Sequence, residues 1–362
     1  MSAPYSHSVI DPRPHPDTPD LEYVVCDYCG AGAGHTLDNL PPPEALPFGM
    51  HRLGASALRL ERAPIRFCAC PDCGLVYMNP RLTEPAIARF YDKVYGTPGA
   101  HAGFESTQER RAAYLLDRAA RLLATGAGQP AILDIGCGAG QILGAAQTRG
   151  WQVYGSELSV VAAARASERL GVPIHVGDFR AMDIPPASLD VVTILEVVEH
   201  LRAPMDFLRA GVALLKPGGV LVLEIPNIAS LEYYVARLLR QRWRGFIIEH
   251  LYYFTPAFMR RLLPELGLRI GAISSRNPMS RLPNPFRDAT ALLGRRSAGE
   301  PAPDGAEPEP DVPPLAPVSL PRRVLRQANN YLLDGIAYLS ERIGTRGNTL
   351  FVWARKLDEE RP

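Results

Sequence analysis

The chain has 362 residues, of which 46% are hydrophobic and 21% charged, and its formal net charge is +1. These values predict a folded globular protein of about two domains and argue against a basic protein that coats nucleic acid. No apolar run reaches roughly 18 residues, and the proline-rich first residues lack an apolar core, so we expect neither a membrane-spanning nor a secreted protein.

Composition and hydrophobic period divide the chain into segments with different expected structures. In chain order these are a disordered N-terminus (1–20), a cysteine-bearing module (21–80), a helical connector (81–126), a core of alternating strands and helices (127–275), a Pro-rich linker or insertion (276–321), and an amphipathic helix with a final strand (322–362). The helices expected outside the core lie at about 83–94, 106–123 and 324–343, and the final strand lies at 349–355.

Short apolar runs alternate with helical stretches from residue 131 onward. The expected strands lie at 132–137, 153–158, 174–178, 189–197 and 220–225, with helices at 141–149, 160–170 and 205–215 between them. A helix at 231–243, a helix at 256–266 and a strand at 268–274 follow. This alternation predicts an α/β fold, doubly wound around a mostly parallel sheet.

Five of the six cysteines lie between positions 26 and 73, and four of them form two C-x-x-C-G motifs. Four thiolates at Cys26, Cys29, Cys70 and Cys73 can close a tetrahedral zinc site with no open position, which predicts a structural metal. The 40 residues between Cys29 and Cys70 exceed the about 15–20 of a usual zinc ribbon. Cys68 therefore remains an alternative ligand to Cys70, and redox chemistry remains an alternative to metal.

A glycine-rich loop, ILDIGCGAGQIL at 132–143, follows a predicted strand and opens a helix. Gly136, Gly138 and Gly140 allow a sharp turn and a close approach of a ligand to the backbone, and the following helix offers free N–H groups. Dinucleotide-dependent oxidoreductases use a similar loop, but here the spacing is G-x-G-x-G and Asp134 stands two residues before the first glycine.

Two acidic residues end the next two predicted strands. Glu157 stands where a carboxylate can accept hydrogen bonds from both hydroxyls of a ribose. Asp178, in the motif GDF with Phe179, stands where it can accept a hydrogen bond from the amine of an adenine. The loop and both acids together predict a nucleoside-containing cofactor.

Two further motifs, LDVVTILEVVEHL at 189–201 and LKPGGVLVLEIPN at 215–227, complete a characteristic order. With them, residues 131–227 resemble class I S-adenosylmethionine-dependent methyltransferases. The resemblance implies a seven-stranded Rossmann-like sheet and S-adenosylmethionine as cofactor. The cofactor-binding residues that it implies are Asp134, Gly136, Cys137, Gly138, Gly140, Glu157, Leu158, Asp178, Phe179, Leu195 and Glu196.

The candidate catalytic residues follow the fourth and fifth predicted strands. The segment FIIEHLYYFTP at 246–256 resembles the E-H-L-x-Y-F segment of sugar C-methyltransferases and of related enzymes from polysaccharide clusters. That resemblance implies that Glu249 and His250 lie over the acceptor and transfer its proton, whereas His200 serves either catalysis or the cofactor lid. Ile248 stands where those C-methyltransferases often have a second histidine, which favours O-methylation.

Residues 74–96 also resemble the zinc-binding segment that precedes many such bacterial methyltransferases. We expect residues at about 228–255 to form a cap over the acceptor, and the sequence leaves two roles open for it. Arginines alternate there with Leu238, Leu239, Trp243 and Phe246. This stretch either packs on the sheet or forms a basic, aromatic surface for anionic lipid or a lipid-linked substrate. Only three of the 39 basic residues are lysine, so a general arginine bias weakens the second alternative.

We therefore expect a cytoplasmic methyltransferase for a small molecule or for a sugar unit of a surface polysaccharide or natural product, with peripheral contact at the inner membrane face as an alternative. A zinc-containing RNA methyltransferase is disfavoured by the near-neutral charge and by EIPN at the exit of the fifth strand, where base methylation would call for N/D-P-P-Y. Nucleic acid is thus not an expected partner. A catalytically silent cofactor-binding subunit is the remaining alternative.

Overall fold

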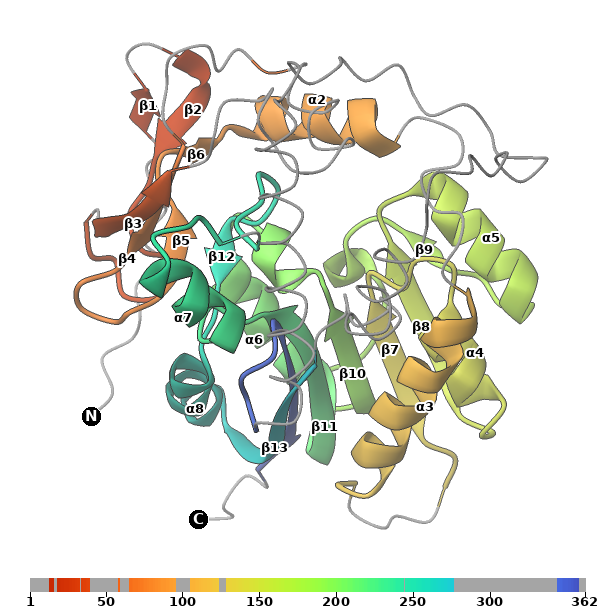
Figure 1. Cartoon of the computed structure of the whole chain (residues 1–362). Coiled ribbons are helices and arrows are strands. Elements are labelled where there is room, and N and C mark those ends of the chain that lie inside the picture. Colours follow the sequence, from red (N-terminus) through yellow and green to blue (C-terminus); the bar gives the residue numbers. More distant parts are fainter. Residues whose placement is uncertain are drawn as a thin grey trace, which may run out of the picture. The chain divides into compact units, whose positions relative to one another are not determined.

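The computed structural model describes residues 13–15, 18–32, 34–39, 58, 65–95, 105–123, 128–243, 245–276 and 344–357. Figure 1 labels most of their helices and strands. The chain divides into two compact units, and each contains segments that are far apart in the sequence. The first unit takes residues 1–102, 228–252 and 276–348, and the second takes residues 103–227, 253–275 and 349–362.

The second unit is built on a seven-stranded sheet with the order β13-β14-β11-β10-β7-β8-β9. The strands are β7 (Ala131–Ile135), β8 (Gln152–Glu157), β9 (His175–Val176), β10 (Leu189–Leu195), β11 (Leu215–Pro226), β13 (Leu268–Arg276) and β14 (Thr349–Lys356). β9, β8, β7, β10 and β11 pair in parallel, whereas β14 pairs antiparallel with β11. The mostly parallel, Rossmann-like sheet expected from the sequence is confirmed.

Helices cover both faces of this sheet, as a doubly wound fold requires. They are α3 (Glu105–Ala120), α4 (Gln141–Gln147), α5 (Val160–Leu170), α6 (Pro204–Leu214) and α8 (Pro256–Glu265), with short 3₁₀ turns η2 (Phe179–Ala181) and η3 (Val198–His200). Local sequence sets their ends: the Ser159 side chain accepts a hydrogen bond from the amide of Ala162 at the start of α5, and Gly171 ends it in a left-handed conformation.

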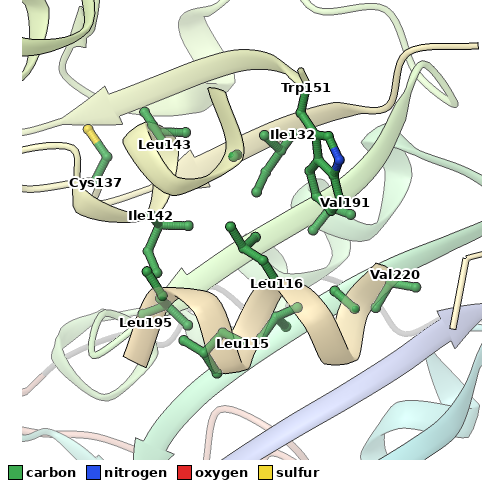
Figure 2. Packing of buried hydrophobic residues seen from close by; sticks show 14 of the residues in the cluster. Leu115, Leu116, Ile132, Cys137, Ile142, Leu143, Trp151, Val191, Leu195 and Val220 are labelled. Carbon is green, nitrogen blue, oxygen red and sulfur yellow. The ribbon is translucent and has the colours of Figure 1, made fainter. Parts of the chain in front are cut away.

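One hydrophobic cluster joins α3 and α4 to one face of the sheet (Figure 2). Leu115 and Leu116 of α3 pack with Ile132, Val191 and Val220, which come from three neighbouring strands. On the opposite face, α6 approaches closely at Gly211, where an added Cβ would lie 3.5 Å from Ile194. The alternation of Val191 and Ile194 between the two faces explains why β10 is apolar throughout.

The described residues of the first unit form two small sheets and two helices. One sheet has the order β1-β2-β6 and the other the order β12-β5-β4-β3. Their strands are β1 (Arg13–His15), β2 (Thr18–Tyr23), β3 (His35–Asn39), β4 (Arg66–Ala69), β5 (Val76–Met78), β6 (Arg81–Leu82) and β12 (Tyr252–Tyr253), and the helices are α2 (Glu84–Tyr95) and α7 (Leu231–Leu238).

The expected disorder of residues 1–20 is wrong for the two segments that form β1 and β2. Polar residues of β2 are buried in ion pairs, because Asp20 binds Arg89 and Glu22 binds Arg81. The local composition, rich in proline and polar residues, does not reveal such distant partners.

The helix expected at 231–243 ends at Leu238. Arg240 adopts a left-handed conformation with φ 53°, and the amide of Gln241 reaches back to the carbonyl of Ala236. This is a Schellman ending, in which glycine is the usual left-handed residue. Because this position holds an arginine and not a glycine, the sequence did not indicate that the helix ends here.

The stretch at 228–252 groups with the first unit, although the sequence analysis placed it in the core with the sheet. Of the residues considered for a lipid surface, Trp243 and Phe246 are buried and Phe246 stacks on Phe67, whereas Leu238 and Leu239 are exposed, so contact with lipid stays a prediction. The linker from residue 277 onward and the helix expected at 324–343 lie outside the described residues. Among the residues that are described, no helix is long and apolar enough to cross a bilayer.

Candidate cofactor site and cysteine cluster

The glycine-rich loop leaves β7 and turns sharply at the carboxyl end of the sheet. The amides of Gly136 and Cys137 both donate to the carbonyl of Ser156 on β8, at 2.8 and 3.1 Å. Gly136 and Gly138 have φ of 77° and 54°, and an added Cβ on Gly138 would meet nothing within 4 Å. The loop therefore presents an open stretch of backbone to which a ligand can come close.

Glu157, the last residue of β8, makes hydrogen bonds to the glycine-rich loop and to the turn that follows β8. Its carboxylate accepts one hydrogen bond from the amide of Gly138 and one from the amide of Ser159, both at 2.9 Å. The side chain of Leu158 beside it is 76% exposed. A carboxylate can accept hydrogen bonds from hydroxyl groups and an exposed apolar side chain can cover a ring, and a nucleoside offers both hydroxyls and a ring.

Asp178 is held by a residue that the sequence analysis did not single out. The side chain of Arg180 donates to both carboxylate oxygens, and its amide donates to one of them. The Arg180 guanidinium lowers the pKa of Asp178, because it stabilises the carboxylate. Phe179 is buried and packs edge-to-face against Phe207, with ring centroids 4.9 Å apart.

Asp134 and Glu224 are buried acids on β7 and β11. Asp134 accepts a hydrogen bond of 2.6 Å from the hydroxyl of Thr193, and burial raises its pKa to about 6. Glu224 forms an ion pair with Arg111 of α3. Arg111 also lowers the pKa of Asp134, so this guanidinium acts on both buried acids.

The end of β10 carries an unusual backbone conformation. Glu196 has φ 57°, a value that residues other than glycine rarely adopt, and its amide donates to the carbonyl of Glu224 at 2.8 Å. Such strained residues concentrate at functional sites. Leu195 is buried, whereas the side chain of Glu196 is exposed.

Glu199 and His200 lie on η3, directly after this strained residue. Glu199 is fully buried, and burial together with the charges of Glu196 and Glu224 raises its pKa well above the usual range. The amide of His200 donates to the carbonyl of Val197. Of the three predicted catalytic residues, His200 lies in the second unit and Glu249 and His250 in the first, so their assembly at one acceptor remains a prediction.

The four cysteines of the two C-x-x-C-G motifs come together in the first unit. The sulfur atoms of Cys26, Cys29, Cys70 and Cys73 all lie within 4.8 Å of one another. Two of the separations, Cys26 to Cys73 and Cys29 to Cys70, are 3.5 Å. Zinc–sulfur bonds of about 2.3 Å in a tetrahedron place sulfurs roughly 3.8 Å apart, so this donor set fits zinc.

Both motifs fold in the same way. In the first, the amide of Gly30 donates to the carbonyl of Cys26 at 2.8 Å, and in the second, the amide of Gly74 donates to the carbonyl of Cys70 at 2.9 Å. Cys68 lies outside the cluster: its thiol donates to the carbonyl of Asn79 and contacts Thr36. The geometry thus brings Cys70, and not Cys68, to the other three sulfurs.

A comparison with known proteins gives the family. The sequence model described as a methyltransferase domain matches residues 107–272. A ubiquinone biosynthesis O-methyltransferase of Chromobacterium violaceum is 30% identical over 177 residues, which cover 44% of this chain and 74% of that protein. The chain belongs to the S-adenosylmethionine-dependent methyltransferases.

Two further proteins are similar to this methyltransferase. A ubiquinone biosynthesis O-methyltransferase of Xanthomonas euvesicatoria is 31% identical over 184 residues, which cover 45% of this chain and 71% of that protein. The crystal structure of an S-adenosylmethionine-dependent methyltransferase from Archaeoglobus fulgidus covers 75% of this chain and 99% of its own, at 19% identity and a TM-score of 0.41. The family assignment rests on the sequence matches.

The residues of this methyltransferase that the sequence predicted for the cofactor are close neighbours in the second unit. The glycine-rich loop, Glu157, Asp178 and Glu196 follow β7, β8, β9 and β10 at the same edge of the sheet. The sequence analysis missed Arg111 and Arg180. Neither lies in a recognisable motif, and in a chain so rich in arginine their residue type carries no signal.

Proposed function

We propose that this methyltransferase transfers the methyl group of S-adenosylmethionine to a hydroxyl group of a small organic acceptor. The observation that carries the proposal is the similarity of this chain to proteins named as O-methyltransferases, at about 30% identity and over most of their length. The sulfonium of the bound cofactor supplies an already activated methyl group, so the chain has to align the two reactants and accept a proton.

The proposed roles follow from the geometry of the second unit. Glu157 holds the ribose hydroxyls while the open backbone at Gly138 faces the cofactor. Asp178, with its carboxylate oriented by Arg180, recognises the adenine amine beside Phe179. Leu158 covers one face of the adenine ring. The other residues of the proposed cofactor site are Asp134, Gly136, Cys137, Gly140, Leu195 and Glu196.

The proposed chemistry of the acceptor rests on Glu249, His250 and His200. A hydroxyl loses its proton during or after methyl transfer, and an imidazole with an ordinary pKa near 6.5 is matched to that task at neutral pH. Two classes of acceptor fit such a base: the sugar hydroxyl expected from the sequence, and a ring hydroxyl, which the names of the relatives favour because ubiquinone carries ring methoxy groups.

A methyl-transfer assay with tritiated cofactor distinguishes these acceptors. Purified protein is incubated separately with a lipid extract, a pool of sugar nucleotides and polysaccharide precursors, and total RNA, and labelled products are identified by mass spectrometry. We expect an O-methyl product in the lipid or the sugar pool. Label in RNA, or in no pool although the cofactor binds, would overturn the proposal in favour of an RNA methyltransferase or a silent subunit.

We also propose that Cys26, Cys29, Cys70 and Cys73 hold one structural zinc ion. Four thiolates leave no position for a substrate, so the metal stabilises the first unit and takes no part in methyl transfer. Elemental analysis of Cys70→Ser and Cys68→Ser tests this, because Cys68 on β4 and Cys70 just after it are both buried, but only Cys70 belongs to the cluster of four sulfurs. We expect zinc to be lost in Cys70→Ser and retained in Cys68→Ser.

A further inference from the structure

The second pair of cysteines lies in the turn of a β-hairpin. β4 ends at Ala69, directly before Cys70, and β5 begins at Val76, shortly after Cys73. The two strands pair antiparallel, with Phe67 opposite Met78. Strands of four and three residues are too short to form a stable hairpin alone, so the turn has a large influence on whether this hairpin is ordered.

Residues 246–252 lie against this hairpin at both of its strands. The ring of Phe246 stacks on that of Phe67 of β4, with centroids 4.3 Å apart and an angle of 13° between the planes. The amide of Met78 of β5 donates to the carbonyl of Leu251 at 2.8 Å, and β12 is the neighbour of β5 in the sheet. Glu249 and His250 lie between these two points of attachment.

The segment has little regular structure of its own. Between the end of α7 and β12, the described residues contain turns and extended backbone but no helix or strand. Aromatic contacts support it from within: Trp243 packs edge-to-face on Phe246 and on Tyr233, with ring centroids 5.3 and 5.6 Å apart. The position of residues 246–252 therefore depends on the hairpin beneath them.

We propose that a metal ion at the cysteine cluster positions residues 246–252, and that Phe67 is the positioning residue that links the two. The inference rests on the proposed zinc site, since closing four thiolates on a metal fixes the hairpin turn at Cys70 and Cys73. The fixed hairpin holds Phe246 through Phe67 and Leu251 through Met78. Glu249 and His250 are thereby ordered without touching the metal.

The test uses the full chain with Trp151→Phe and Trp353→Phe, which leaves Trp243 as its only tryptophan. Zinc is titrated into reduced protein that has been stripped with a chelator. Bound metal, emission of Trp243, hydrogen exchange of peptides spanning residues 246–252, and affinity for S-adenosylhomocysteine are measured on the same samples. Peptides from β8 in the second unit serve as the internal control for exchange.

We expect one zinc ion to slow exchange in residues 246–252 by at least about tenfold and to shift the Trp243 emission, while exchange in β8 and the affinity for S-adenosylhomocysteine stay unchanged. Phe67→Ala should bind zinc with the same stoichiometry but lose most of this protection. Phe246→Leu removes the same stack from the other side, so a folding defect in one variant does not decide the outcome. Cys68→Ser should behave as the parent protein.

Two results would overturn the inference. Zinc that binds without any change in residues 246–252, or a Phe67→Ala variant that responds like the parent, would leave the zinc site in place but remove its link to the segment. Absence of bound zinc in the parent protein would instead refute the zinc site itself, and the inference with it.

Discussion

Glu157 accepts a hydrogen bond from the amide of Gly138, which joins the end of β8 to the glycine-rich loop after β7. Replacing it by alanine removes a charged acceptor both from this loop and from the proposed ribose site. Because hydrogen bonds to charged groups contribute about 1.5–3 kcal/mol, we expect Glu157→Ala to weaken S-adenosylmethionine binding at least tenfold in titration calorimetry. Glu168→Ala, on the exposed face of α5, is the control. An unchanged affinity in folded Glu157→Ala would refute the assignment of Glu157.

The buried carboxyl of Asp134 should make stability depend on pH. Its pKa is about 6 in the folded protein and 3.8 without the fold, so the folded state keeps a proton that the unfolded state releases. The stabilisation is complete below about pH 4 and is lost as the pH rises to about 6, and the shift corresponds to about 3 kcal/mol at most.

Asp134→Asn retains an oxygen for the hydroxyl of Thr193 but cannot ionise. We therefore expect the wild-type protein to lose stability relative to Asp134→Asn between pH 4 and pH 6, as measured by urea unfolding. Asp206→Asn, an exposed position on α6, should follow the wild-type curve. Parallel curves for wild type and Asp134→Asn would contradict the burial of an ionisable acid here.

Gly245 allows the Trp243 indole to fold back onto the chain. An added Cβ would lie 2.3 Å from a carbon of that ring, which is far closer than any real contact. We expect Gly245→Ala to destabilise the first unit by about 1–3 kcal/mol and to change the emission of Trp243, since overpacking forces side chains away from their preferred positions. Gly32→Ala is the matched control, because its Cβ would meet nothing within 4 Å. Equal melting temperatures for the two variants would show that the ring moves freely.

Substitution of His250 and of His200 should affect turnover and cofactor affinity differently. We expect His250→Ala to lower the single-turnover rate by about 10²–10⁴, as loss of a general base does, while cofactor affinity stays within about threefold. His200→Ala should affect cofactor binding at least as much as turnover. Near-full activity of His250→Ala from pH 6 to pH 9 would mean that another residue is the base or that alignment of the reactants is sufficient.

The sequence predicted the sheet of the second unit well because its strands are buried on both faces. β7, β8 and β10 lie within two residues of the ranges expected from apolar runs, and each is followed by a loop marked by glycine or acidic residues. The cofactor loop and its acids were recognisable for the same reason. The residues of a short motif that binds one ligand keep a fixed spacing in the sequence, so the motif can be recognised there.

Side chains that pair across long distances in the sequence could not be predicted in this way, because no local pattern marks them. The ion pair of Arg111 with Glu224 joins a helix before the glycine-rich loop to a strand well after it. Residues 228–252 belong to the first unit and not to the expected core, and Phe246 within them stacks on Phe67, which lies far away in the sequence. In both cases the side chains are ordinary for their segments, and only the tertiary structure gives them partners.

The place of β14 in the sheet has a consequence for synthesis of the protein. This strand comes last in chain order, yet it lies between β11 and β13, and its Trp353 indole donates to the carbonyl of Leu115 in the core. While the ribosome is still making residues 277–348, β11 and β13 each have an open edge, and open edges pair readily with other chains. A nascent or truncated chain that ends before Thr349 therefore leaves the edge of β11 open to aggregation in the middle of its own sheet, and synthesis of β14 is the step that removes this hazard.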